Sequence, residues 1–373
     1  MTKTGVRRLI GSALTVLVAS ATAAAVSAAP AAAAVTVAWQ KIDYPPADEV
    51  WSFTPLADST YTATTRSGGG PFCDPCNVTY QLWQKQSGQA WKDISPPGKE
   101  IVDSTTGTAA DDVWAFKNDN GLMGYHWDGT AWTANSPDTA RFSTKDSKAL
   151  SHDDVWAAGT YKATTSQWVP AVAHFDGQGW NIAKLPDSMR TATLNTMSVN
   201  ADDDIWVAGF KDKGTITGDA YQPFAAHWNG TQWTESALPS SSPDSTLLYA
   251  VVAKSPNDVW LGGNLYNLQG DIKGVKTGGY VLHWDGSTWK RIDVPGKDIL
   301  WVSSFAYHDG RLWAGVVSNT SKGAARWTGT SWEFVNGPNG TLSKEGQLSA
   351  SPDGSLYMND YSTLARLAPQ SLR

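Results

Sequence analysis

Apolar and polar positions alternate in short runs along most of the chain, and turn residues separate the runs. Leu248–Val252 is a typical apolar run, and an Asp-containing turn separates it from the pair Val259-Trp260. Short runs with period-two alternation, bounded by Gly, Pro, Asn and Asp, are typical of β-strands. The pattern therefore predicts many short strands joined by turns.

Two motifs recur and predict four strands, A to D, in each repeat. The first, Asp-Asp-Val-Trp or a close variant, ends at Trp114, Trp156, Trp206 and Trp260. The second, His-Trp-Asp-Gly-Thr-x-Trp or a close variant, begins at His126, His174, His227 and His283. Val-Trp lies on strand B, His-Trp on strand C and the last Trp on strand D. Asp-Gly makes the C–D hairpin, because glycine accepts a positive φ at no steric cost.

The repeats are counted from the aromatic residue of strand B. These residues are Tyr61, Trp114, Trp156, Trp206, Trp260, Trp313 and Tyr357. Asp48–Trp51 also matches the first motif, but it follows Trp39 too closely, so Val50–Phe53 is interpreted as a strand A. Seven units of about 48 residues have the length of propeller blades.

The last repeat ends at Leu364–Leu367 without a strand D. Residues 38–42 resemble the D strands of other repeats, so we expect this N-terminal strand to complete the last blade and leave no open sheet edge. The predicted fold is all-β: a seven-bladed β-propeller of four-stranded blades. Residues 35–373 then form a single cooperative domain.

Residues 1–34 have the features of a signal peptide. Lys3, Arg7 and Arg8 precede an apolar run from Leu9 to Ala25, and small residues follow at 32–34. We expect a secreted protein, extracellular or associated with the cell wall, with no membrane association after cleavage. An uncleaved anchor is the alternative. The net charge of -6 disfavours nucleic acid as a partner.

The two cysteines, Cys73 and Cys76, lie in a Gly- and Pro-rich segment. Zinc would need further ligands close by, and an oxidising compartment favours a disulfide that pins this loop. The four motif histidines occupy one equivalent position in different blades, so they are expected to serve blade packing rather than to converge on a metal. No metal site and no cofactor are predicted.

Three of the 20 tryptophans fall outside the repeat positions: Trp51, Trp168 and Trp301. Trp51 and Trp301 fall where strand A begins and Trp168 falls in a B–C loop, so all three are expected on one face. The alternative is that they only pack loops onto the blades. Three long B–C loops, at 64–78, 211–223 and 266–279, point to the same face as a binding surface. The channel mouth there is predicted to carry Trp51, Asp103, Asp146, Asn195, Tyr249, Trp301 and Gln347.

Enzyme motifs such as G-x-S-x-G, H-E-x-x-H and the Walker loop do not occur. Asp103 and Asp146 are the one candidate pair of carboxylates for glycoside hydrolysis. Aromatic rings beside acids and amides would also suit a sugar. A glycan-active hydrolase or lyase, or a lectin with its site at the channel mouth, is therefore the alternative to a non-enzymatic binding protein.

The two repeated motifs behind a signal peptide resemble those of secreted actinobacterial seven-bladed propellers, and the chain is similar to the dispase autolysis-inducing family. The resemblance covers residues 38–367. It implies a non-enzymatic propeller that acts on a metalloprotease and is cross-linked by transglutaminase through exposed glutamines. Gln40 and Gln347 are the accessible candidates. The sequence thus predicts a monomeric binding protein whose partner is an extracellular protein or a cell-wall glycan.

Overall fold

The computed structural model describes residues 37–68, 78–98, 101–118, 122–136, 141–212, 221–239, 245–266, 278–295, 299–319, 323–337 and 346–369. Contacts divide the chain into two units, Met1–Ala33 and Ala34–Arg373, and all described residues belong to the second. In the described part, no helix is long and apolar enough to span a bilayer. Cys73 and Cys76 lie outside the described residues, so their predicted disulfide stays a prediction.

The described strands form seven antiparallel four-stranded sheets, the blades of a β-propeller. Blades 1 to 3 are β2 (Glu49–Pro55), β3 (Tyr61–Ser67), β4 (Thr79–Lys85) and β5 (Lys92–Asp93); β6 (Val102–Ala109), β7 (Asp112–Asn118), β8 (Leu122–Trp127) and β9 (Trp132–Ala134); and β10 (Phe142–Ser151), β11 (Asp154–Lys162), β12 (Trp168–Phe175) and β13 (Trp180–Lys184). Blades 4 and 5 are β14 (Ala192–Ala201), β15 (Asp204–Asp212), β16 (Tyr221–Trp228) and β17 (Trp233–Glu235); and β18 (Ser245–Ser255), β19 (Asp258–Tyr266), β20 (Gly278–Trp284) and β21 (Trp289–Arg291). Blades 6 and 7 are β22 (Ile299–His308), β23 (Arg311–Ser318), β24 (Ala324–Trp327) and β25 (Trp332–Val335); and β26 (Gln347–Ala350), β27 (Leu356–Asn359), β28 (Leu364–Leu367) and β1 (Gln40–Ile42). One short 3₁₀ helix, Asp187–Met189, joins blades 3 and 4.

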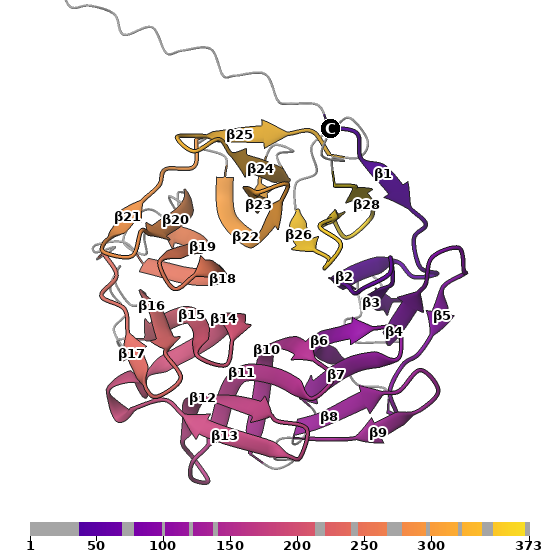
Figure 1. Ribbon diagram of the computed structural model, residues 1–373, viewed down its shortest axis with the longest axis horizontal. Helices are drawn as coiled ribbons and strands as arrows, with labels where there is room; N and C mark the ends of the chain where they lie inside the picture. The colour runs from indigo at the N-terminus through magenta and orange to yellow at the C-terminus, as the bar shows by residue number, and fades with distance from the viewer. Residues whose placement is uncertain are drawn as a thin grey trace, which may run out of the picture. The chain divides into compact units, whose positions relative to one another are not determined.

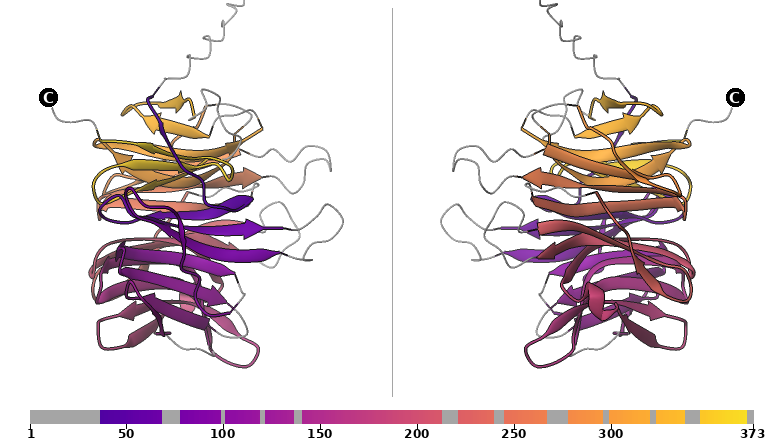
Figure 2. Two further views of the ribbon diagram at one scale, coloured as in Figure 1. Left: turned by 90° about the vertical axis from the view of Figure 1, so that its right-hand side faces the viewer. Right: turned by 90° about the vertical axis from the view of Figure 1, so that its left-hand side faces the viewer.

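The blades are arranged in a ring, with each strand A facing the centre and each strand D at the rim (Figure 1). In side view, strands of neighbouring blades cross the thickness of the ring (Figure 2). The predicted fold class is confirmed. The interpretation of Val50–Phe53 as part of a strand A is confirmed too, because β2 is the first strand of blade 1 and pairs with β3.

The ring closes through the N-terminal strand, as predicted. β1 pairs with β28, with Gln40 opposite Arg366, and supplies the strand D that blade 7 lacks. The Trp39 indole N–H donates to the Asn336 carbonyl at 2.7 Å. The Tyr44 hydroxyl accepts from the backbone N–H of Val50 in blade 1 at 2.7 Å and donates to the carbonyl of Tyr361 in blade 7. The segment that follows β1 therefore joins the last blade to the first.

Apolar side chains fill the spaces between neighbouring blades. Between blades 3 and 4, for example, Trp156 and Val172 pack with Met197, Ile205 and Trp233. The strand-B tryptophans of blades 2 to 6 are all buried, which explains why that position recurs so regularly. The repeated pattern thus supplies the hydrophobic core between blades.

Each C–D hairpin glycine in blades 2 to 5 lies against the A–B turn of its own blade. These glycines have φ between +81° and +91°, and a Cβ built on them would lie within 3.0 Å of the Cβ of the turn residue. The pairs are Gly129 with Asp111, Gly177 with Asp153, Gly230 with Asp203, and Gly286 with Asn257. Glycine is required there both for its backbone conformation and for this close approach.

The four motif histidines hydrogen-bond the strand-B aspartate of their own blade, Nε2 to Oδ1, at 2.8–2.9 Å. The pairs are His126–Asp112, His174–Asp154, His227–Asp204 and His283–Asp258. Each imidazole also lies against the strand-B tryptophan, with ring centroids 3.8–4.7 Å apart. The prediction that these histidines serve the blades is confirmed.

Candidate functional site: the central channel and its mouth

A cavity of about 710 Å³ occupies the centre of the ring and is lined by the strands A of all seven blades. Five residues predicted at the channel mouth line it: Asp103, Asp146, Asn195, Tyr249 and Gln347. Trp51 and Trp301 are not among its lining residues. The structure therefore brings the predicted polar residues and one aromatic residue together around a single space.

A β-bulge on strand A contributes a residue to this wall in five of the blades. In blades 2 to 6, strand A carries one extra residue opposite the same part of strand B, and these residues are Asp103, Lys145, Asn195, Tyr249 and Ser303. All five line the cavity. A bulge leaves its extra residue unpaired in the ladder and redirects the side chain. The recurrent bulge thus places an extra strand-A residue of each of these five blades at the channel.

Lys145 and Ser303 are members of this set that the sequence did not predict at the mouth. In blade 3, the prediction from sequence named Asp146 instead of the bulge residue Lys145. In blade 6, it selected Trp301, which pairs with Val317, instead of Ser303. Lys145 is exposed and adds a positive charge to a wall for which the sequence had indicated only carboxylates, amides and aromatics.

Asp146 is engaged in joining two blades. Its Oδ2 accepts from the backbone N–H of Met197 at 2.9 Å and from the Thr196 hydroxyl at 3.3 Å, both in blade 4. Its Oδ1 accepts from the backbone N–H of Ser147 at 2.8 Å and from the Lys148 ammonium at 2.9 Å. A carboxylate has about four lone-pair sites, and these donors use them all. Asp146 therefore acts as a structural link in the channel wall.

Similar hydrogen bonds join other blades around the channel. The Asn195 amide donates to the Leu248 carbonyl at 2.9 Å, between blades 4 and 5. The buried Asn359 amide donates to the Val50 carbonyl at 3.0 Å, between blades 7 and 1. Within blade 7, the Gln347 amide donates to the Tyr361 hydroxyl at 3.2 Å. The first two bonds thus link neighbouring blades beside the channel.

Tyr249 is the exposed aromatic residue of the channel wall. Tyr249 is one of the large hydrophobic residues that remain exposed, and 38 % of its surface is open to solvent. Burial of the rest of the side chain raises the pKa of the Tyr249 phenol, so the hydroxyl stays protonated at neutral pH. Tyr249 therefore offers an apolar ring and a neutral hydrogen-bond donor at the same place.

The three off-repeat tryptophans lie on the ends of strands A and C that meet the predicted face. Trp51 is 37 % exposed; its indole N–H donates to Glu49 at 3.0 Å, and its ring packs edge-on against Tyr80. Trp168 is 48 % exposed, with the Lys162 ammonium 5.8 Å from its ring centroid. Trp301 is partly buried. Two aromatic surfaces thus remain open to solvent outside the cavity.

The two cross-linking candidates lie in different surroundings. Gln40 is exposed on β1, in regular pairing with Arg366. Gln347 lines the channel and is only partly exposed. Of the long B–C loops, residues 69–77, 213–220 and 267–277 lie outside the described part of the chain. Their predicted contribution to binding stays a prediction.

Comparisons with known proteins confirm the propeller and no narrower class. No protein-family model matches the chain. None of the curated proteins matches it either. Among solved structures, it is similar to YCF48 bound to a D1 peptide, with 14 % identity, 89 % of this chain and 95 % of that chain covered, and a TM-score of 0.58.

Two further structures show the same architecture. PorZ, a surface component of the type-IX secretion system of Porphyromonas gingivalis, is 13 % identical, with 87 % of this chain and 47 % of that chain covered and a TM-score of 0.56. The WD40 propeller domain of Doa1 is 9 % identical, with 88 % and 95 % covered and a TM-score of 0.53. Identities this low show a shared fold, and the function has to be argued from the site.

Proposed function

We propose that this protein is a secreted, non-catalytic binding protein that holds a polypeptide segment of an extracellular partner at the mouth of the central channel. One observation carries the proposal: five successive blades use a β-bulge to present a side chain to a single cavity. A feature repeated in this way, but with a different residue in each blade, has the character of a recognition surface on a rigid scaffold.

The chemistry of these residues suits a polypeptide. Asp103 and Lys145 supply opposite charges, Asn195 an amide and Ser303 a hydroxyl. A polypeptide presents N–H donors, carbonyl acceptors and charges of both signs, all of which this wall can pair. Tyr249 adds a rigid aromatic surface of the kind enriched at protein interfaces. The similar fold of YCF48, which is bound to a D1 peptide, lends support.

Hydrolysis of a glycan is disfavoured by the state of Asp146. The two-carboxylate mechanism needs an acid and a base, or a nucleophile, whose oxygens can reach the substrate. All lone-pair sites of Asp146 are taken by hydrogen bonds, two from Ser147 and Lys148 of blade 3 itself and two that link it to blade 4. A proton-transfer role would have to break this link. The pair Asp103–Asp146 thus loses one partner.

A narrower form of the proposal follows the family resemblance. In it, the partner is a secreted metalloprotease, the protein is extracellular or associated with the cell wall, and transglutaminase cross-links it through an exposed glutamine. Gln40 fits this role better than Gln347, because Gln40 is exposed at the rim whereas Gln347 is part of the channel wall. Incorporation of an amine tag into the folded protein, compared with Gln40→Asn, tests this form alone.

The main test is a peptide array and a glycan array probed with the labelled protein, followed by calorimetry on each hit. Tyr249→Ala removes the aromatic surface at the mouth. Leu150→Ala is the matched control, because Leu150 is 39 % exposed and lies near the opposite end of its strand A. We expect a peptide hit that Tyr249→Ala weakens by about tenfold or more, as for an interface anchor, and Leu150→Ala leaves unchanged.

Three other outcomes would contradict the proposal. Hits confined to the glycan array would make the protein a lectin. Cleavage of a glycan substrate, lost in Asp103→Asn, would make it an enzyme. A peptide hit that survives Tyr249→Ala and Asp103→Asn would place binding away from the channel.

A further inference from the structure

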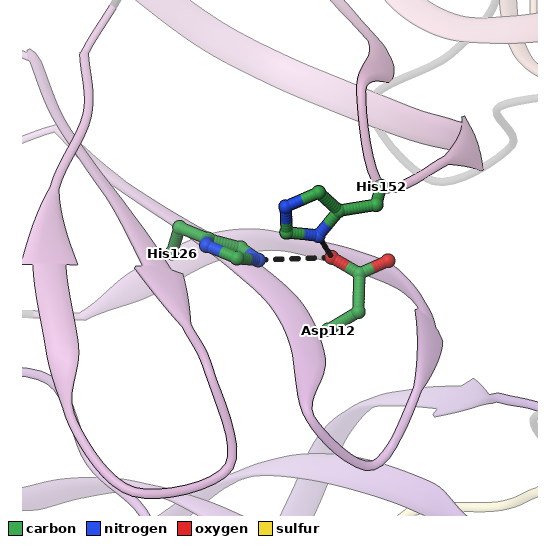
Figure 3. A group of neighbouring side chains, drawn as sticks. All are labelled: Asp112, His126 and His152. Carbon is green, nitrogen blue, oxygen red and sulfur yellow. Dashed lines mark hydrogen bonds and ion pairs between the residues drawn. The ribbon is translucent and has the colours of Figure 1, made fainter. Parts of the chain in front are cut away.

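A cluster of two histidines and an aspartate lies between blades 2 and 3, on the face formed by the A–B turns. Asp112 begins β7, His126 lies on β8, and His152 follows β10 in the next blade. Nε2 of His126 lies 2.9 Å from Oδ1 of Asp112, and Nδ1 of His152 lies 3.2 Å from the same oxygen. Both rings point at one carboxylate oxygen (Figure 3).

His152 does not belong to the repeat. The residue at the matching place in the next A–B turn is Asp202 in blade 4 and Pro256 in blade 5. The Asp204–His227 pair therefore meets Pro256, with which His227 lines a surface pocket, and proline has no side-chain ligand atom. Among the described residues, two histidines and one carboxylate come together where His152 lies beside the Asp112–His126 pair.

The spacing of the three atoms suits a transition metal. Metal–nitrogen and metal–oxygen bonds of zinc are about 2.0–2.2 Å, so ligand atoms of a tetrahedral site stand about 3.3 Å apart. The Asp112 oxygen already lies 2.9 Å and 3.2 Å from the two imidazole nitrogens. All three ligand atoms lie within 4.8 Å of one another. An ion can enter with small movements of the side chains.

The surroundings also suit an ion. The Thr108 hydroxyl donates to the other oxygen of Asp112, which fixes the carboxylate and leaves Oδ1 to the histidines. Nε2 of His152 lies 3.8 Å from Oδ1 of Asp153, a carboxylate placed to orient a ligating imidazole. The side chain of His152 is 60 % exposed, whereas that of Asp112 is 6 % exposed, so the cluster has one open side.

We propose that Asp112, His126 and His152 bind one divalent transition-metal ion of the zinc class, through Oδ1, Nε2 and Nδ1, with water at the open position. The ion takes the place of the hydrogen atoms between the rings and the carboxylate, and the imidazole protons move to the other ring nitrogens. Because the ligands come from two blades, the ion cross-links blade 2 to blade 3. The site lies on the face opposite the mouth proposed for the partner, so the two proposals stand apart.

The test is calorimetric titration of the protein, without a histidine tag, with zinc chloride at pH 7.5. One ion per chain is expected, with a rise in the midpoint of thermal unfolding. His152→Ala removes an exposed ligand at little cost to folding. Loss of a residue that only hydrogen-bonds a ligand already weakens metal binding about tenfold, so His152→Ala should weaken zinc binding by more than that. His227→Ala is the matched control, because it disrupts the equivalent pair in blade 4, which has no second histidine. It should leave the zinc affinity unchanged.

A second measurement reports the ligands directly. Copper(II) bound at the site should show nitrogen hyperfine splitting from two imidazoles, and His152→Ala should show at most one. No binding at millimolar zinc, or equal affinity in the wild-type protein and His152→Ala, would overturn the proposal and make the cluster a hydrogen-bonded contact only.

Discussion

Replacing Gly230 with alanine tests whether the C–D hairpin is locked against the A–B turn of its blade. Gly230 has φ +85°, and a Cβ there would lie 2.8 Å from the Cβ of Asp203. An L-residue in the left-handed region costs about 1–2 kcal/mol. Forcing an extra carbon into a filled space costs about 1–3 kcal/mol. We therefore expect Gly230→Ala to lower the free energy of unfolding by about 2–5 kcal/mol.

Gly88 separates the two contributions. It occupies the C–D hairpin of blade 1 with φ +73°, and a Cβ there would meet nothing within 4 Å. Gly88→Ala should therefore show the backbone cost alone, about 1–2 kcal/mol. The loss of unfolded-state freedom that accompanies Gly→Ala is common to both variants and cancels in their difference. That difference measures the contact with Asp203.

Urea titration followed by circular dichroism gives both free energies of unfolding. A double variant closes the cycle: in the Asp203→Gly background, which lacks the opposing Cβ, Gly230→Ala should cost no more than Gly88→Ala. Equal costs for Gly230→Ala and Gly88→Ala in the wild-type background would refute the reasoning, as would a coupling free energy near zero.

Two further predictions concern single side chains. Tyr44→Phe removes the hydroxyl that joins Val50 to Tyr361 and should lower the free energy of unfolding by about 1–3 kcal/mol in urea. Burial raises the pKa of Tyr44 to about 12, above its ordinary 10.0. The contribution of the Tyr44 hydroxyl to the free energy of unfolding is therefore complete below pH 10.0 and lost toward pH 12. Tyr44→Phe should remove this dependence of the free energy of unfolding on pH, and an unchanged slope between pH 10.0 and pH 12 would contradict the prediction. Hydrogen bonds from the hairpin backbone and a threonine hydroxyl lower the pKa of Asp128 from 3.8 to about 2, so its stabilisation is present above pH 3.8 and lost toward pH 2. Asp128→Asn, which copies the Asn229 of blade 4, should remove this part of the acid dependence in unfolding curves measured from pH 4 to pH 2; the same dependence in the variant would count against it.

The architecture could be predicted because each blade repeats the same buried positions. A buried aromatic residue on strand B, a glycine in the C–D hairpin and a Trp on strand D recur in most blades, so their spacing fixes the count. Spacing also rejected the motif match at Trp51. Trp39 and the residues after it resemble the strands D of other blades, and this likeness predicted how the ring closes. A strand D has to pack in the same way in every blade, so the same residue type recurs there.

The channel wall could be predicted only in part. A β-bulge adds one residue to a strand without any mark in composition, so the sequence pointed to Asp146 where Lys145 is the bulge residue. Whether a carboxylate is available for chemistry depends on donors from another blade, as with Met197 and Asp146, and no local pattern shows that. A signal for His152 was present in the sequence: four of the six histidines occupy the repeat position, and His152 and His308 lie outside it.

Pairing between β1 and β28 means that the propeller can be completed only near the end of synthesis of the chain. The Tyr44 hydroxyl and the carbonyl to which it donates are 317 positions apart, and β1 finds its partner only when nearly the whole chain has been synthesised. Contacts of such long range are slow to form. Until β28 has been synthesised, β1 has no strand to pair with. A chain that ends before β28 therefore cannot close its ring, even if its other blades have folded.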